Sequence, residues 1–142
     1  MSPARQKARR LARLADIRQL DVRIAENRAI AARSQADAAL SQVERVRAII
    51  AEAGAARGVS TGAMLAGAAG LRSLLQSALD VAMHDAREKT QLHSRHVQLH
   101  ARAEARADHV QESLRHNRRL ADLGAEDKER DDRPHRRRKD RP

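Results

Sequence analysis

Residues 54–70 read GAARGVSTGAMLAGAAG and hold five of the six glycines of this 142-residue chain. The flanking stretches, Ala4–Ala53 and Leu71–Leu123, contain neither glycine nor proline. Each is long enough for a helix of about 75 Å at 1.5 Å per residue, which exceeds the width of a globular domain of this mass. The sequence therefore predicts two long helices that lie antiparallel as a hairpin.

The composition supports an elongated all-α protein. The chain has no Phe, Tyr, Trp or Cys, while 34% of its residues are charged. A narrow coiled-coil seam can be built from Ala, Leu, Ile and Val, but a wide core cannot. The lack of cysteine excludes disulfides, thiol catalysis and Cys-ligated zinc. The longest uncharged run, Gly58–Leu71, is too short to span a bilayer, and no secretory signal is visible.

The apolar spacing predicts an irregular antiparallel coiled coil. In the first helix, about residues 4–53, we expect a seam that changes phase and therefore contains a stutter. Its two parts are Leu14, Ile17, Leu20, Ile24, Asn27 and Ala31, then Ala36, Leu40, Val43, Val46, Ile50 and Ala53. In the second helix, about residues 71–123, the expected seam is Leu92, His96, Leu99, Ala103, Ala107, Val110, Leu114, Asn117 and Ala121.

The turn region, residues 54–70, and the end of the chain complete the predicted organisation. Ser60 or Thr61 is expected to cap a short helix, which Gly70 breaks before the second long helix. Gly124 is expected to stop that second helix. We therefore predict a hairpin over residues 1–123 and a charged, disordered tail over residues 124–142.

The segment Leu71–Met83 is apolar around more than half of its circumference, which is more than one partner helix needs. Two interpretations follow. In the first, the short glycine-flanked helix folds back and covers the apolar surface that the partner helix leaves open. In the second, the segment is an exposed patch for another protein.

The net charge of +10 is distributed unevenly. One basic cluster is Arg5, Lys7, Arg9, Arg10 and Arg13, and another is Arg136, Arg137, Arg138 and Lys139. A hairpin brings both clusters to one end, where they could dock on an acidic protein, on nucleic acid or on lipid. One hypothesis is thus a basic coiled coil that binds nucleic acid or acts as a scaffold. The absence of aromatic side chains disfavours stacking on single strands.

Catalytic and metal chemistry find little support. His93, His96 and His100 share a helical face, but no reliably placed further ligand joins them and no HExxH motif is present. We predict a solvated surface with His96 alone in the seam. A two-helix rod also lacks a pocket and a nucleophile–base pair, so we expect no enzymatic activity and no cofactor.

The segment GVSTGAMLAGAAGLRSLLQSALDVA, residues 58–82, leads through the turn region into the second helix. In this segment, in its length, in its coiled-coil hairpin and in its basic C-terminal tail, the chain resembles the FliJ and YscO family. These are small stalk proteins of flagellar and injectisome type III secretion. The resemblance implies a cytoplasmic, non-enzymatic stalk, peripheral to the inner membrane at the export apparatus. The implied partners are a hexameric export ATPase, a membrane export gate protein and export chaperones.

The resemblance also implies two groups of binding residues. The group at the ATPase ring is Arg5, Arg9, Arg10, Arg13, Arg115, Arg118 and Arg119. The stripe that faces the gate has a large apolar residue, Leu and Ala at i, i+4 and i+7, followed by one more position. In this chain these positions are Leu71, Leu75, Ala78 and Ala82.

Overall fold

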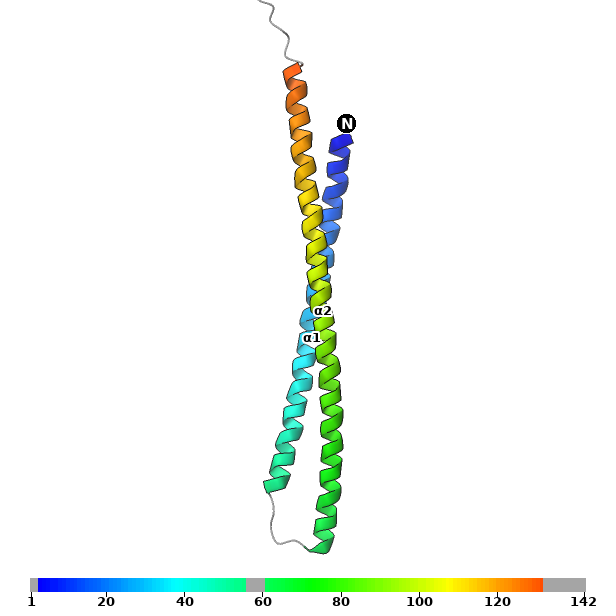
Figure 1. Ribbon diagram of the computed structural model, residues 1–142, viewed down its shortest axis with the longest axis vertical. Coiled ribbons are helices and arrows are strands. Elements are labelled where there is room, and N and C mark those ends of the chain that lie inside the picture. The colour runs from blue at the N-terminus through cyan, green and yellow to red at the C-terminus, as the bar shows by residue number, and fades with distance from the viewer. Residues whose placement is uncertain (1–2, 56–60, 132–142) are drawn as a thin grey trace, which may run out of the picture. The chain divides into compact units, whose positions relative to one another are not determined.

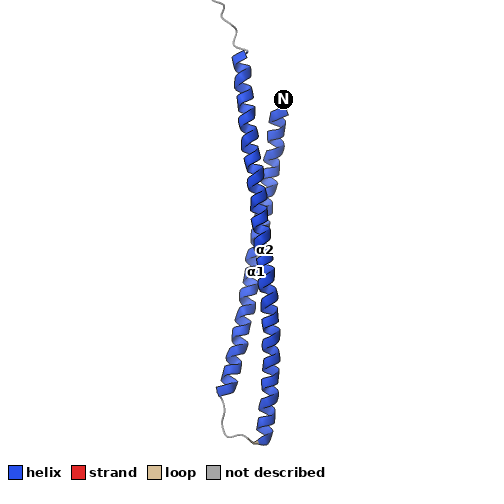
Figure 2. Ribbon diagram, viewed as in Figure 1, coloured by secondary structure: helices blue, strands red, loops and turns tan. Residues whose placement is uncertain are grey.

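The computed structural model describes residues 3–55 and 61–131. Helix α1 spans Pro3–Ala55 and helix α2 spans Gly62–Asp131. No strand occurs among the described residues (Figure 2), and the two helices pack against each other. The predicted all-α fold of two packed helices is therefore confirmed.

Helix α2 begins in the middle of the glycine-rich stretch. The backbone N–H of Met64 donates to Thr61 Oγ1 at 3.3 Å, and the N–H of Leu65 donates to the Thr61 carbonyl at 3.0 Å. Capping by Thr61 is thus confirmed, while Ser60 lies outside the described residues. The predicted break at Gly70 is wrong. A glycine costs a helix only about 1 kcal/mol relative to alanine, and the alanine and leucine neighbours here are strong helix formers.

The other predicted boundaries also shift. Helix α1 continues through Gly54 to Ala55, and α2 passes Gly124 and ends at Asp131. Lys128 and Arg130 in the last turn of α2 interact favourably with the negative end of the helix dipole. The expected disordered tail is therefore helical up to Asp131, whereas residues 132–142, with their basic block, lie outside the described residues.

Replacing Gly124 with alanine is expected to raise the free energy of unfolding by about 0.5–1 kcal/mol. A Cβ added at Gly124 meets no atom within 4 Å, and none of the described glycines has a positive φ. Urea denaturation followed by circular dichroism measures the change. Ala125→Gly, one residue further on, is the matched control and should shift stability in the opposite direction. If Gly124→Ala destabilises the chain, Gly124 ends the helix after all.

The chain divides into two compact units, and each is an antiparallel pair of helical segments (Figure 1). Unit 2 is Arg23–Ala101. Its core contains Ala39, Val43 and Val46 of α1 packed against Ala82 and Ala86 of α2. Buried and half-buried residues recur in it with alternating spacings of four and three. They are Ala25, Ala29, Ala32, Ala36, Ala39, Val43, Val46 and Ile50 on α1, and Leu75, Leu79, Ala82, Ala86, Lys89, His93, His96 and His100 on α2.

Unit 1 joins Met1–Val22 to Arg102–Pro142. Ala15 of α1 packs with Val110 and Leu114 of α2. The same spacing recurs here, with Ala4, Ala8, Leu11, Ala15, Arg18 and Val22 facing Ala103, Ala107, Val110, Leu114, Asn117 and Ala121. The side-chain amide of Asn117 donates to the Ser113 carbonyl at 2.8 Å, so this polar residue in the seam has a hydrogen-bond partner.

The spacing in both units corrects the predicted seams. Alternation of four and three is a regular heptad pattern, so the stutter expected in the first helix is wrong. Six predicted seam residues are buried as expected: Ala36, Val43, Val46, Ala107, Val110 and Leu114. In the first part of α1, alanines such as Ala15 and Ala32 take the inward positions, whereas Ile17, Leu20 and Ile24 lie exposed at 56%, 57% and 43%. Alanine lets two helix backbones approach closely, and larger side chains then project beside the contact or away from it. Leu92 and Leu99 are likewise exposed. His93 and His100 are half-buried at seam positions beside His96, so the prediction that His96 alone lies in the seam is wrong.

Candidate docking surfaces

The first candidate surface is a groove in unit 1 with a volume of about 290 Å³. Three of the predicted ring-binding arginines line it together: Arg5 and Arg9 from α1, and Arg118 from α2. All three are exposed, and Ala8 and Ala121 form part of the floor between them. Asp122 also lines the groove and supplies a negative charge. Antiparallel pairing thus gathers arginines that are more than a hundred residues apart in the sequence.

The other predicted ring-binding residues are distributed over unit 1. Arg10 and Arg13 line a second groove along α1, with Gln6 and Arg9. Arg115 and Arg119 are exposed on α2 and line neither groove. The seven arginines therefore form a basic surface on both helices rather than one cluster.

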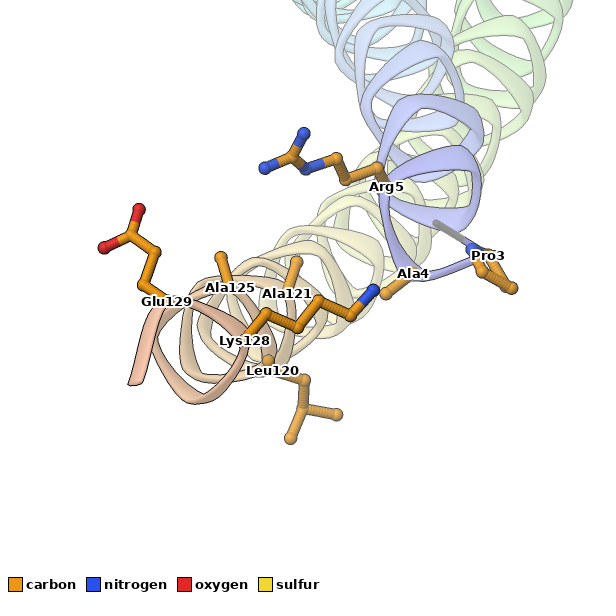
Figure 3. A pocket seen from close by; sticks show the side chains of 9 residues that line it. Pro3, Ala4, Arg5, Leu120, Ala121, Ala125, Lys128 and Glu129 are labelled. Carbon is orange, nitrogen blue, oxygen red and sulfur yellow. The ribbon is translucent and has the colours of Figure 1, made fainter. Parts of the chain in front are cut away.

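A cleft of about 600 Å³ lies between the start of α1 and the end of α2 in unit 1 (Figure 3). Small residues line much of it: Ala4 from α1, and Ala121, Gly124 and Ala125 from α2. The Lys128 side chain extends across the cleft toward the first turn of α1 (Figure 3). Sequence reasoning missed this cleft because it ended the second helix at Leu123. The sequence signal for this cleft was the small residues at seam positions near the start of α1, Ala4, and near the end of α2, Ala121 and Ala125.

The four predicted gate-facing residues divide into two pairs in unit 2. Leu71 is 50% exposed and Ala78 is exposed. Leu75 is half-buried, and Ala82 is 9% exposed within the alanine and valine core. The latter two occupy heptad positions that face α1. Only Leu71 and Ala78 are therefore readily accessible to another protein.

Three further exposed apolar residues, which the predicted gate-facing stripe did not include, lie on the same side of α2 as Leu71. Met64, Leu74 and Val81 are 62%, 67% and 70% exposed. Of the two interpretations of the Leu71–Met83 segment, the covering short helix is wrong, and Leu71, Leu74, Ala78 and Val81 are exposed. No short helix folds back over it, because the residues expected to form that helix belong to α2 itself.

The described part of the chain offers little for metal chemistry. Within residues 3–55 and 61–131, no group of three or more His, Asp or Glu side chains could hold a metal ion. In the same residues, neither helix has a stretch long and apolar enough to cross a membrane. Comparison with family models, curated proteins and solved structures finds no match to this chain.

Proposed function

We propose that this chain is a non-enzymatic coupling protein of a flagellar or related type III protein export apparatus. Unit 1 binds a hexameric export ATPase, and unit 2 binds a membrane export gate protein. Export chaperones are further partners. The protein then acts in the cytoplasm, peripheral to the inner membrane at the export apparatus.

The observation that carries the proposal is the gathering in unit 1 of Arg5, Arg9 and Arg118 along one groove. Arginine presents a planar fork of donors that suits the carboxylates of a protein surface. The same unit places Arg10, Arg13, Arg115 and Arg119 on its exposed faces. A basic surface formed by both helices is the kind that an acidic ring pore could surround.

The gate-binding role rests on the exposed apolar side of α2 in unit 2. Leu71 and Ala78 lie on that side and are accessible. Leu75 and Ala82 face α1, so their contribution is to hold the helix pair under the surface. Contiguous exposed apolar area of this kind is typical of protein interaction sites.

The test measures ATP hydrolysis by the export ATPase of the same cell while the purified chain is added. We expect hydrolysis to rise with the concentration of the chain. Replacing Arg9 and Arg118 together with alanine should raise the concentration of the chain that gives half-maximal stimulation about tenfold, because two exposed charge contacts are lost.

The matched control replaces Arg23 and Arg45 with alanine. Both are exposed arginines of unit 2, so the net charge changes equally while the unit 1 groove is untouched. This control should stimulate hydrolysis like the unmodified chain. No stimulation by the folded chain, or equal loss in both variants, contradicts the proposal.

Nucleic-acid binding is the second candidate, and the groove formed by Arg9, Arg10 and Arg13 along α1 favours it. Closely spaced guanidinium groups on one helix suit a phosphate backbone. Tight binding to duplex DNA that falls steeply with salt, without ATPase stimulation, would support this candidate in place of the first.

A further inference from the structure

The first twenty residues of α2, Gly62–Val81, form an exposed apolar segment of unit 2. The beginning of α2 extends past the end of α1 (Figure 1). Every residue from Gly62 to Leu74 is exposed, because α1 ends at Ala55 and covers little of this part. The segment holds only two charged residues, Arg72 and Asp80.

One stripe along this segment has an unusual order of side-chain sizes. It consists of Met64, Gly67, Leu71, Leu74, Ala78 and Val81, all of them exposed. Their spacings are three, four, three, four and three, so they share one helical face. In size the order is large, small, large, large, small, large. Both the spacing and the order of sizes read the same in either direction.

A stripe that reads the same in both directions is complementary to itself across a two-fold axis. Two antiparallel copies of α2 bring Leu71 opposite Leu74 of the second copy at the axis. Gly67 then meets Ala78, and Met64 meets Val81. Each of these three contacts occurs twice, once on either side of the axis, as in an isologous interface. The 3-4 spacing is also the one that antiparallel coiled coils use.

The charges around the stripe are compatible with this pairing. Arg72 and Asp80 lie off the stripe. The residues that flank it are uncharged: Ala63, Ala68, Gly70, Leu75 and Ser77. No like charges therefore meet across the axis, and the small flanking residues let two helices approach closely.

The opposite side of unit 2 does not offer the same surface. A groove of about 390 Å³ lies there, and Leu40 and Met83 contribute its large apolar side chains. Glu44, Arg47 and Arg87 line the same groove, so a partner would have to pair or desolvate these charges.

We propose that the stripe from Met64 to Val81 docks a second copy of this chain, antiparallel and across a two-fold axis. A 20-residue helical contact is about 30 Å long and buries about 1,000 Å² in total, which is near the lower limit for a specific interface. An interface of this size is typical of transient complexes, so we expect the dimer to exchange with the monomer.

Sedimentation equilibrium of the full chain over a concentration series tests the dimer. Leu74→Asp should raise its dissociation constant at least about a hundredfold, because it buries two unpaired carboxylates near the axis. Since Leu74 is 67% exposed, the helicity and melting temperature of the chain should not change. Val97→Asp, at a 46% exposed residue away from the stripe, is the control and should dimerise normally. A monomer at all concentrations, or equal dimerisation of both variants, overturns the proposal.

Disulfide trapping tests the direction and register of the pairing, since the chain has no cysteine of its own. Met64→Cys chains mixed with Val81→Cys chains should form a mixed disulfide dimer on oxidation. Met64→Cys chains alone should not, because their two cysteines are about 25 Å apart in the antiparallel pair. Cross-linking of Met64→Cys with itself, or no mixed disulfide, contradicts the pairing.

The dimer does not depend on the proposed export function, because both measurements use the purified chain alone. The stripe contains Leu71 and Ala78, so dimerisation and gate binding compete for one surface. A chain that dimerises but neither stimulates the ATPase nor binds the gate would disprove only the export function.

Discussion

Ala39→Asp lowers the free energy of unfolding by about 3 kcal/mol or more, enough to separate the helices of unit 2. Ala39 is 7% exposed and packs among Val43, Val46 and Ala86. An aspartate there replaces apolar contacts of this core with a carboxylate that loses much of its hydration. Thermal and urea unfolding followed by circular dichroism at 222 nm measures the loss.

Ala38→Asp is the matched control. Ala38 precedes Ala39 on the same helix and is exposed. Both substitutions exchange the same side chains, so the lower helix propensity of aspartate affects both equally and cancels in the comparison. We expect the control to change stability by about 0.5 kcal/mol. Equal losses in the two variants would mean that the heptad positions deduced from burial are wrong.

The existence of two helices could be predicted from the sequence, but the inward positions in the first part of α1 could not. The long stretches without glycine or proline, together with the mid-chain glycines, are enough to predict two helices. In the later part of each helix most predicted seam residues are buried or half-buried, among them Val43, Val46, Val110 and Leu114. In the first part of α1 the predicted seam instead followed the largest apolar residues, among them Ile17, Leu20 and Ile24. Those residues point outward, whereas Ala15 and Ala32, which the predicted seam omitted, are 7% and 5% exposed. In a chain so rich in alanine, an inward alanine has no local signal that distinguishes it from an outward one.

The predicted helix ends at Gly70 and Gly124 were wrong because glycine was taken as a stop signal. A glycine signals a helix end only when the backbone adopts a positive φ or when neighbours cannot continue the helix. Gly67 and Gly70 meet neither condition, because they lie among alanines and leucines. This error hid the exposed stripe on α2, because the predicted break at Gly70 placed Met64 and Gly67 on a different helix from Leu71.

The arginine groove was easier to anticipate. An antiparallel hairpin places the start of the first helix beside the end of the second, and the resemblance added Arg118 to Arg5 and Arg9 in this region. Their arrangement along one groove depends on the heptad positions. The predicted seam gave those positions on α2 but not at the start of α1, and it did not separate accessible Leu71 from buried Ala82.

Leu114→Ala is expected to lower the free energy of unfolding by about 2–4 kcal/mol, with its effect concentrated in unit 1. Leu114 is 3% exposed and is the only leucine among the buried core residues of the described chain. It packs with Ala15 and Val110, whose short side chains cannot expand to fill the space it leaves. Leu120→Ala, at a leucine that is 51% exposed, is the control and should cost about 0.5 kcal/mol.

Hydrogen exchange of the Leu114→Ala chain distinguishes a local loss from a global one. Unit 1 has a core of its own around Leu114, whereas unit 2 has a separate core around Val43. Local opening in one unit costs less than unfolding of both, because the contacts of the second core remain. Amides of the paired helical segments in unit 1 should therefore lose protection, and those around Val43 should keep it. Equal loss of amide protection in both units would mean that the two cores unfold as one cooperative structure. A cavity at Leu114 in unit 1 would then also destabilise the part of α2 that carries the apolar stripe in unit 2.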